Sequence, residues 1–387
     1  MATSTPGRSR TRRAELLGLR GTVLRGRSLR PGTVGVRDGV LADVPRRAVR
    51  DLPPGWVISP GMVDVQLNGF AGAEVGADPE ALATIAAALP RTGVTAFCPT
   101  LVTRTPAAYR RAAAALARAR VPEAAARPLG VHLEGPFLNP ARHGAHDPAA
   151  LREPDPALLD ELLAAFRPAI VTLAPELPGG LEAIARIARA GAVPAIGHTE
   201  ADAATARAAL GVGARLLTHA MNAMPGLTAR EPGPLGVALA DRRAHVSAIA
   251  DGVHLSDETS CTLGRAAGAR LVLISDAVAA AAMPPGRYRL GTRTVTSDGT
   301  RATSRGRLAG AVAGLDAGPR TLVRAGIPVA AALAAATSAP RRLLRLPPGL
   351  APGGPADLVV LDDGLVPRLT LVGGRVAFAD PGLPFEP

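Results

Sequence analysis

Residues 195–199 read Ala-Ile-Gly-His-Thr, and residues 216–224 read Leu-Leu-Thr-His-Ala-Met-Asn-Ala-Met. Each stretch is a short apolar run that ends at a histidine, His198 in the first and His219 in the second. A run of this kind is typical of a buried strand whose last side chain emerges at the edge of a sheet. The segment between them, residues 201–210, is rich in Ala and is followed by glycines that stop a helix. The unit therefore predicts strand, helix and strand, with one imidazole at the carboxyl end of each strand.

Two parallel strands that are joined by a helix end at the same edge of their sheet, where α/β folds keep their sites. His198 and His219 are therefore candidate ligands of a shared metal ion. The alternative is a pair of buried histidines that bond to backbone groups, which is the commoner case for any single histidine.

The same alternation of apolar runs and Ala-rich segments extends to both sides of this unit. Eight runs read as strands, at residues 62–67, 94–101, 129–133, 170–173, 193–196, 215–218, 245–250 and 271–275. Eight strands with helices between most of them predict an α/β fold, a closed (β/α)8 TIM-like barrel. A doubly wound open sheet is the competing fold, but no Gly-x-Gly-x-x-Gly motif follows the first strand.

The two ends of the chain differ from this middle region and resemble each other. Both contain short Val/Leu runs that are broken by Gly, Pro and Arg, which is hairpin composition. We predict a small β-sandwich domain that is built from both termini, residues 15–59 plus 350–387, with the catalytic barrel, residues 60–349, inserted between them. Residues 1–14 are rich in Ser, Thr and Arg and predict a disordered tail.

The composition excludes several classes of protein. The formal net charge is +12, but all 44 basic residues are Arg, spread along the chain apart from a cluster in residues 8–13. Because aromatic residues make up only 2% of the chain, the stacking platform of a nucleic-acid surface is missing, and we expect no nucleic-acid partner. The absence of Lys excludes a Gly-Lys-Ser/Thr phosphate loop and Schiff-base chemistry.

Two Cys residues are too few for a disulfide framework or a thiolate metal site. No apolar run reaches the roughly 18 residues of a membrane span. The amino-terminal residues lack the apolar region of a secretory signal. We therefore expect a cytoplasmic protein with no membrane partner.

Ionisable residues collect where the predicted strands end. Glu134 follows the third run, His198 and His219 follow the fifth and sixth, and Asp276 follows the eighth. A carboxylate with two imidazoles leaves an open position for water on zinc or a similar divalent ion. Asp276 would then be placed to take a proton from that water. The alternative is a local role for each acid, since Glu134 precedes Gly-Pro and Asp276 would serve as a helix cap.

Nine segments carry a resemblance, at residues 60–69, 132–140, 144–146, 172–176, 197–199, 218–224, 230–233, 249–254 and 275–277, and five of them hold the candidate metal ligands, the candidate base and the amides of the first strand. These five read Pro-Gly-Met-Val-Asp-Val-Gln-Leu-Asn-Gly at 60–69, His-Leu-Glu-Gly-Pro-Phe-Leu-Asn-Pro at 132–140, Gly-His-Thr at 197–199, Thr-His-Ala-Met-Asn-Ala-Met at 218–224 and Ser-Asp-Ala at 275–277. The sequence resembles the amidohydrolase superfamily and, within it, the deacetylases that act on N-acetylglucosamine 6-phosphate. The resemblance implies a metal-dependent hydrolase that releases acetate and glucosamine 6-phosphate, usually as a homodimer.

The resemblance also implies that Glu134, His198 and His219 ligate one divalent metal ion per chain, with zinc expected first and iron, cobalt or manganese also suited. Most members of the superfamily carry His-x-His at the end of the first strand and hold two metals. Here that place reads Gln66-Leu67-Asn68. Neutral amides bind a divalent cation more weakly than imidazole does, so a single metal is expected.

Carried over residue by residue, the resemblance makes Asp276 the general base that later protonates the leaving amine. It further implies a set of substrate contacts. Two histidines would contact the amide carbonyl and the sugar hydroxyls, and a loop after the sixth strand would contact the phosphate. These residues are His146, His254, Asn222, Ala223 and Arg230. The alternative that Arg230 is an ordinary surface arginine stays open, because arginines occur all along this chain.

One segment departs from the family pattern. Where the family shows Ser-x-Leu-Thr-Met near the acyl group, residues 311–315 read Ala-Val-Ala-Gly-Leu. We expect this loss of bulk to enlarge the acyl pocket, which leaves the acyl and sugar specificity open. The remaining alternatives are an amidohydrolase of another N-acyl amino sugar phosphate and a non-catalytic barrel that binds a sugar phosphate.

Overall fold

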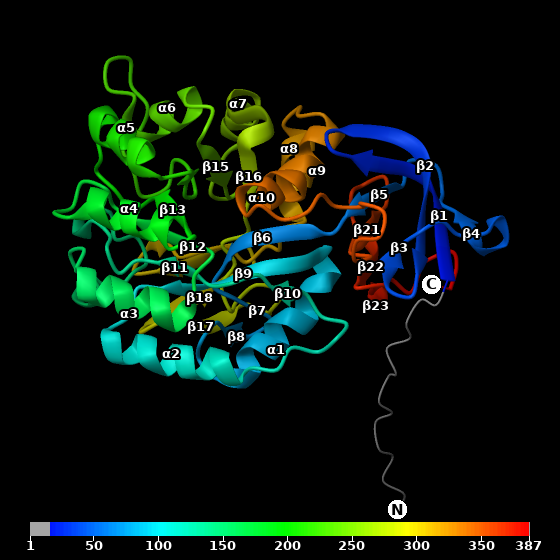
Figure 1. Ribbon diagram of the computed structural model, residues 1–387, viewed down its shortest axis with the longest axis horizontal. Helices are drawn as coiled ribbons and strands as arrows, with labels where there is room; N and C mark the ends of the chain where they lie inside the picture. Colours follow the sequence, from blue (N-terminus) through cyan, green and yellow to red (C-terminus); the bar gives the residue numbers. More distant parts are fainter. Residues whose placement is uncertain (1–15, 387) are drawn as a thin grey trace, which may run out of the picture.

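The computed structural model describes residues 16–386, and the predicted tail at residues 1–14 lies outside them. A barrel of eight parallel strands forms the centre of the molecule, and a separate sheet lies at one side of it (Figure 1). The barrel strands, in spatial order, are β6 (Met62–Leu67), β9 (Val94–Val102), β11 (His132–Glu134), β12 (Ile170–Leu173), β13 (Val193–Ile196), β14 (Leu216–Leu217), β15 (His245–Ala248) and β16 (Leu271–Leu273).

The first and last strands of the barrel meet just beyond β16. Leu67 pairs with Ala277 in parallel, and the N–H of Asp276 donates to the carbonyl of Gln66 at 2.9 Å. These contacts bring the ends of β6 and β16 to the same mouth of the barrel. The predicted fold class, a TIM-like barrel with a small β domain from both termini, is confirmed.

Helices surround the barrel and begin at capping residues. The side chain of Asp202, for example, accepts from the N–H of Thr205 at 2.7 Å and starts the helix between the two histidine strands. This helix ends at Gly213, whose φ is +132°. The predicted helix at 201–210 is therefore observed two residues later, because Asp202 supplies the cap. The helices are α1 (Pro79–Ala88), α2 (Pro106–Arg118), α3 (Pro156–Phe166), α4 (Gly180–Arg189), α5 (Ala203–Val212), α6 (Gly233–Ala240), α7 (Asp257–Ala267), α8 (Ala317–Arg324), α9 (Val329–Ala336) and α10 (Ser338–Leu343).

The second sheet joins both ends of the chain. Its strands are β1 (Leu16–Arg25), β2 (Ser28–Arg37), β3 (Val40–Leu41), β4 (Val49–Asp51) and β5 (Val57–Pro60), with β21 (Leu358–Leu361), β22 (Pro367–Val372) and β23 (Arg375–Ala379). β5 pairs with β1 on one side and with β21 on the other, so the blue and red strands lie side by side in Figure 1. Alternate residues such as Leu19, Val36 and Val360 enclose a core of their own.

Smaller strands flank the barrel mouth and its edge. They are β7 (Gly69–Phe70), β8 (Ala73–Glu74) and β10 (Arg127–Pro128), and the four strands of one antiparallel sheet, β17 (Gly286–Leu290), β18 (Arg293–Ser297), β19 (Ala302–Ser304) and β20 (Arg307–Leu308). Within residues 16–386, no helix has the length and apolar character that a bilayer crossing requires.

Candidate active site and metal centre

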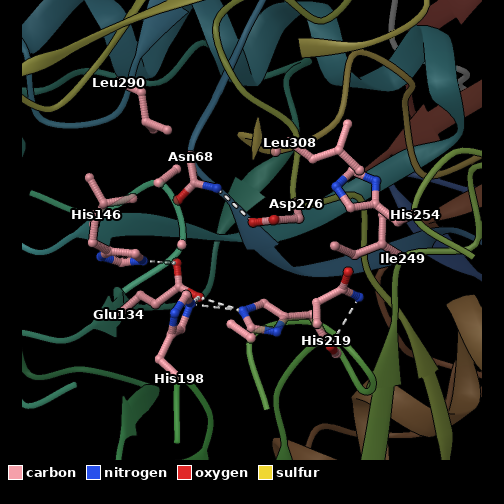
Figure 2. Close-up of a pocket in the computed structure, with 16 residues that line it drawn as sticks. Asn68, Glu134, His146, His198, His219, Ile249, His254, Asp276, Leu290 and Leu308 are labelled. Carbon is pink, nitrogen blue, oxygen red and sulfur yellow. Dashed lines mark hydrogen bonds and ion pairs between the residues drawn. The ribbon is translucent and has the colours of Figure 1, made fainter. Parts of the chain in front are cut away.

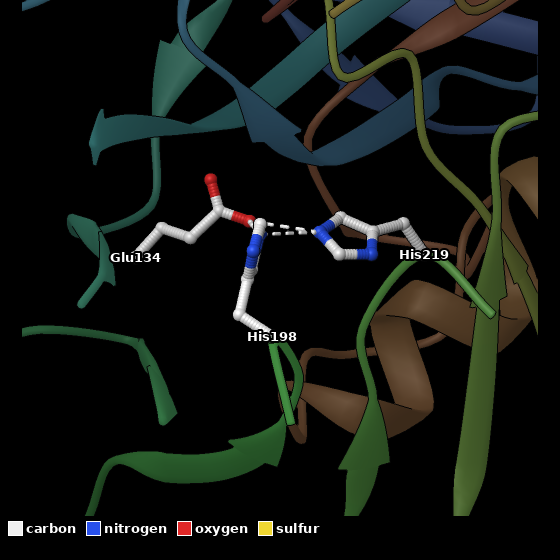
Figure 3. A group of neighbouring side chains, drawn as sticks. All are labelled: Glu134, His198 and His219. Atoms are coloured by element: carbon white, nitrogen blue, oxygen red, sulfur yellow. Dashed lines mark hydrogen bonds and ion pairs between the residues drawn. The ribbon is translucent and has the colours of Figure 1, made fainter. Parts of the chain in front are cut away.

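Three ionisable side chains converge at the carboxyl-terminal mouth of the barrel. Glu134 is the last residue of β11, and His198 and His219 each lie two residues beyond a strand end. Glu134 Oε1 is 3.3 Å from His198 Nε2 and 3.0 Å from His219 Nε2, and the two Nε2 atoms are 3.1 Å apart (Figure 3). All three residues are buried. The structure thus brings together the residues that the sequence nominated as metal ligands.

The backbone turns sharply where the functional side chains emerge. His198, His219 and Asp276 have φ values of +50°, +30° and +50°. A residue with a Cβ in this left-handed region costs roughly 1 kcal/mol or more, so the surrounding structure has to hold it there. The N–H of His219 donates to Ser247 Oγ at 2.8 Å, which is one such restraint. These strand ends therefore store strain to aim their side chains into the mouth.

The donor set fits a divalent cation. His198 Nδ1 lies 2.8 Å from the carbonyl of Arg142, which can only accept, so Nδ1 carries the proton and the lone pair of Nε2 faces Glu134 and His219. Burial disfavours the charged Glu134, but the neighbouring imidazoles of His146, His198 and His219 hold the pKa of this carboxyl well below its usual range. Ligand atoms of a tetrahedral zinc site lie about 3.3 Å apart, close to the spacings of this cluster. Glu134, His198 and His219 would hold the metal.

Asp276 lies beside the cluster and is held by two amides. Asn68 Nδ2 donates to Asp276 Oδ1 at 2.7 Å, and Gln66 Nε2 donates to the same oxygen at 3.3 Å and to Glu134 Oε1 at 2.8 Å. Burial, followed by the charge of Glu134, raises the pKa of Asp276 to about 6. A buried carboxylate with a raised pKa is suited to accept a proton near neutral pH.

Two further histidines line the same cavity, each with its proton position fixed. The N–H of Thr103 donates to His146 Nδ1 at 3.2 Å, so Nε2 of this ring carries the proton, 3.5 Å from Glu134 Oε2. His254 Nδ1 lies 2.9 Å from the carboxylate of Asp251 and donates to it. One ring therefore offers a donor to the cavity, and the other offers an acceptor.

The cavity has a volume of about 150 Å³. Its polar wall holds the residues just described, and Figure 2 shows Leu290 and Leu308 of the four-stranded sheet on the opposite wall. Asn222 and Ala223 line it, as does Gly310, whereas residues 311–315 do not. Arg230 is exposed and lies outside the lining. The structure therefore gathers every predicted site residue at this mouth except Arg230.

A chain of hydrogen bonds crosses the barrel interior beneath the cluster. His132 Nδ1 donates to the carbonyl of Val65 at 2.9 Å, so its Nε2 must accept from Thr172 Oγ1 at 2.8 Å. Thr172 Oγ1 then accepts from Thr218 Oγ1 at 2.9 Å. Burial lowers the pKa of His132 to about 4, which keeps the imidazole neutral. The chain links the strands that carry Glu134 and His219 to β6 and β12.

The sequence identifies Gln66 and Asn68 only as amides that stand where most of the superfamily has two metal-binding histidines. It gives His132 no role. The available signal is the polar pattern Gln-x-Asn at the end of a buried strand. What it could not show is that the amides face Asp276, which is 208 residues away from Asn68.

Comparison with known proteins agrees with this geometry. The profile described as "Amidohydrolase family" matches residues 57–377. The chain belongs to the amidohydrolase family. It is accordingly a metal-dependent hydrolase, as the resemblance predicted.

Similar proteins cover nearly the whole chain. A bovine (Bos taurus) N-acetylglucosamine-6-phosphate deacetylase is 36% identical over 92% of this chain and 94% of its own length. An N-acetylgalactosamine-6-phosphate deacetylase of Escherichia coli O157:H7 is 36% identical over 88% of this chain and 93% of its own length. The solved structure of a mutant N-acetyl-D-glucosamine-6-phosphate deacetylase from Mycobacterium smegmatis, in complex with N-acetyl-D-glucosamine-6-phosphate, has a TM-score of 0.89 at 36% identity. It covers 94% of this amidohydrolase and 100% of that chain.

Proposed function

We propose that this amidohydrolase hydrolyses N-acetylglucosamine 6-phosphate to glucosamine 6-phosphate and acetate. The observation that carries the proposal is the placement of Asp276, a buried carboxylate with a raised pKa, beside the Glu134, His198 and His219 cluster. The names of the similar proteins support the substrate class. The mutant relative that was captured with its substrate is an aspartate-to-alanine variant, which is consistent with an aspartate as the catalytic group.

The proposed chemistry divides the work between the cluster and Asp276. Glu134, His198 and His219 would hold a divalent ion, which would supply Lewis acidity at the amide carbonyl and lower the pKa of water. Asp276 takes the proton from the attacking water and returns it to the amide nitrogen as the C–N bond breaks. Asn68 and Gln66 hold Asp276 in place through the two amide hydrogen bonds described above.

The two cavity histidines fit the polar groups of the substrate. His146 Nε2–H is the donor that would bond to the carbonyl oxygen, where negative charge develops during attack. His254 Nε2 is an acceptor that would bond to a sugar hydroxyl, because Asp251 fixes its other nitrogen as the donor. Each role follows from the tautomer that the neighbouring residue imposes.

The phosphate would lie over the loop after β14. Asn222 and Ala223 line the cavity at that edge, and Arg230 is exposed on the same loop. We infer that Arg230 supplies a guanidinium to the phosphate. Arg230→Ala should then raise KM for the phosphorylated sugar about tenfold with little change in kcat. An equal effect on the unphosphorylated sugar would remove this role.

A second candidate substrate is N-acetylgalactosamine 6-phosphate. The observation that favours it is the 36% identity to the E. coli O157:H7 enzyme, which equals the identity to the bovine enzyme. A panel of the glucosamine, galactosamine and mannosamine epimers, ranked by kcat/KM, separates these alternatives. N-propionyl analogues in the same panel test the expected enlargement of the acyl pocket.

The decisive experiment is an acetate-release assay combined with metal analysis. We expect about one divalent ion per chain, loss of turnover on chelation, and recovery when zinc, iron, cobalt or manganese is restored. Tight binding of the sugar phosphate without turnover would favour the non-catalytic barrel instead. The proposal also includes zinc as the resident ion, a homodimer and a cytoplasmic location. These three rest on the sequence and its resemblance to the family.

A further inference from the structure

The amino-terminal mouth of the barrel, opposite the metal cluster, carries a second cavity. Its volume is about 470 Å³, and it lies among the first residues of β13, β14 and β15 and the end of α10. Leu343 of α10 packs with the residues of the barrel interior, so it separates this cavity from the interior. No predicted site residue lies here.

Cationic side chains surround this cavity with little opposing charge. The cations are the arginines Arg215, Arg243, Arg342 and Arg345, and the imidazole of His245 lies among them. Arg243 forms an ion pair with Asp241 at 2.7 Å. Over residues 16–386, no ion pair joins a carboxylate to the other three arginines. The cavity therefore holds a surplus of positive charge that its own walls leave unbalanced.

Backbone carbonyls hold two of these guanidiniums in place. Arg215 Nη1 donates to the carbonyls of Leu210 at 3.1 Å and Ala214 at 2.6 Å. Arg342 Nη2 donates to the carbonyl of Ala269. Each contact uses one nitrogen of the guanidinium, and the remaining N–H groups make no hydrogen bond in the described part of the chain. These free N–H groups are available to an anion, and the bonds to carbonyls reduce the side-chain freedom that binding would cost.

The imidazole of His245 lines the cavity beside these arginines. Burial, followed by the charges of Arg342 and Arg270, lowers the pKa of His245 to about 4. The imidazole is therefore neutral at pH 7 and can accept or donate without adding charge. The floor of the cavity is apolar and includes Leu129 and Leu344.

We propose that this cavity is a second ligand site, which binds a small organic phosphate. Several guanidiniums around one concavity suit a dianionic phosphate better than a single carboxylate, because each planar fork can bond two of its oxygens. The apolar floor at Leu129 and Leu344 would take the organic part of the ligand. The site is independent of the proposed deacetylase reaction, since it shares no lining residue with the catalytic cavity.

Isothermal titration calorimetry on the metal-loaded protein tests the site, with inorganic phosphate, a nucleoside 5′-monophosphate and a hexose 6-phosphate as probes. The cavity variant is Arg215→Met with Arg342→Met, which keeps the apolar stems. The control is Arg207→Met with Arg265→Met, two exposed arginines on α5 and α7 that do not line the cavity. Both variants lose the same charge, so general attraction of anions falls equally.

We expect the cavity variant to weaken phosphate binding about tenfold or more, and the control to change it less than about twofold. The organic probe that binds tighter than inorganic phosphate identifies the class of ligand. Equal weakening in both variants would reduce the effect to net charge and overturn the site. Binding that neither variant alters, or no binding at about 10 mM phosphate, would overturn it too. If the double variant does not fold, Arg342→Met alone serves, because Arg342 is exposed and its side chain contacts one carbonyl.

Discussion

The two mouths of the barrel are built from opposite ends of the same strands, yet they collect charges of opposite sign. At the carboxyl-terminal mouth, burial and the neighbouring Glu134 raise the pKa of Asp276 to about 6. At the amino-terminal mouth, burial and neighbouring guanidiniums lower the pKa of His245 to about 4. In each case a like charge adds to the effect of burial. The carboxyl-terminal mouth therefore lacks a balancing positive charge, and the amino-terminal mouth lacks a balancing negative charge. Such an imbalance is typical of a binding site.

The mouths differ in their backbone as well. The carboxyl-terminal one aims its groups by left-handed residues at strand ends, while the amino-terminal one is closed by Leu343. This contrast predicts that changes at the first mouth affect the reaction, whereas changes at the second affect stability or the proposed phosphate binding and leave the reaction intact.

Asp276→Asn should have the largest effect on turnover. Removal of the general base should lower kcat by roughly 10²–10⁴-fold, while the metal content stays near one per chain because the proposed ligands Glu134, His198 and His219 are unchanged. Acetate release and metal analysis on the same sample check this. Activity within a few-fold of the parent would mean that another group accepts the proton.

The pH dependence of kcat/KM should show the same group. A base must be deprotonated to act, so activity falls as the pH drops through the pKa of Asp276, about tenfold per pH unit. That pKa is about 6 with the charge of Glu134 opposing ionisation, and a bound cation would lower it. We expect the acid limb at or below about pH 6, measured in buffers of constant ionic strength. An acid limb that persists in Asp276→Asn would belong to a different residue.

Thr172→Val tests the hydrogen-bond chain beneath the cluster. Valine keeps the shape of threonine but leaves His132 Nε2 without a donor and Thr218 without an acceptor. We expect metal affinity, measured by competition with a chelator, to fall about tenfold. Thr172→Ser keeps the hydroxyl and should stay within about threefold. Equal affinities in the two variants would show that the chain only stabilises the fold.

Leu343→Ala should have the smallest effect on activity. Leu343 is 6% exposed and packs in the barrel interior, so its truncation should cost roughly 2–4 kcal/mol of unfolding free energy. The activity of the folded fraction should remain unchanged. Leu344→Ala, at a half-buried neighbour, should cost less in the same denaturant titration. A loss of kcat in Leu343→Ala would couple the two mouths and contradict the division between them.

The sequence predicts the barrel because its strands are continuous apolar runs. Such runs can be recognised without knowing which strands are neighbours. β6, β12 and β13 have the bounds that were expected, while β14 is shorter, with only Leu216–Leu217 paired. The N–H of Thr218 still donates to the carbonyl of Ile196 at 2.8 Å, but the chain then turns at His219, whose φ is +30°. Strand ends near a site are where local patterns are least informative.

The sequence predicts the residues of the candidate site that lie at strand ends and have ionisable side chains. Glu134, His198, His219 and Asp276 meet as expected, since parallel strands share a carboxyl edge. The roles of Gln66 and Asn68 depend on closure between the first and last strands, which no local pattern encodes. The motif around His132 gives this residue no role of its own, and its place as a neutral link between strands follows from two partners that are distant in sequence, Val65 and Thr172.

The pairing of β5 with β21 has a consequence for synthesis. About 300 residues separate these neighbours, so at 5–20 residues per second the ribosome needs roughly 15–60 s to deliver the second strand after the first. During that interval the edge of β5 has no partner, although the whole barrel is emerging behind it. Synthesis of β21, rather than folding of the barrel, is therefore the event that completes the smaller sheet.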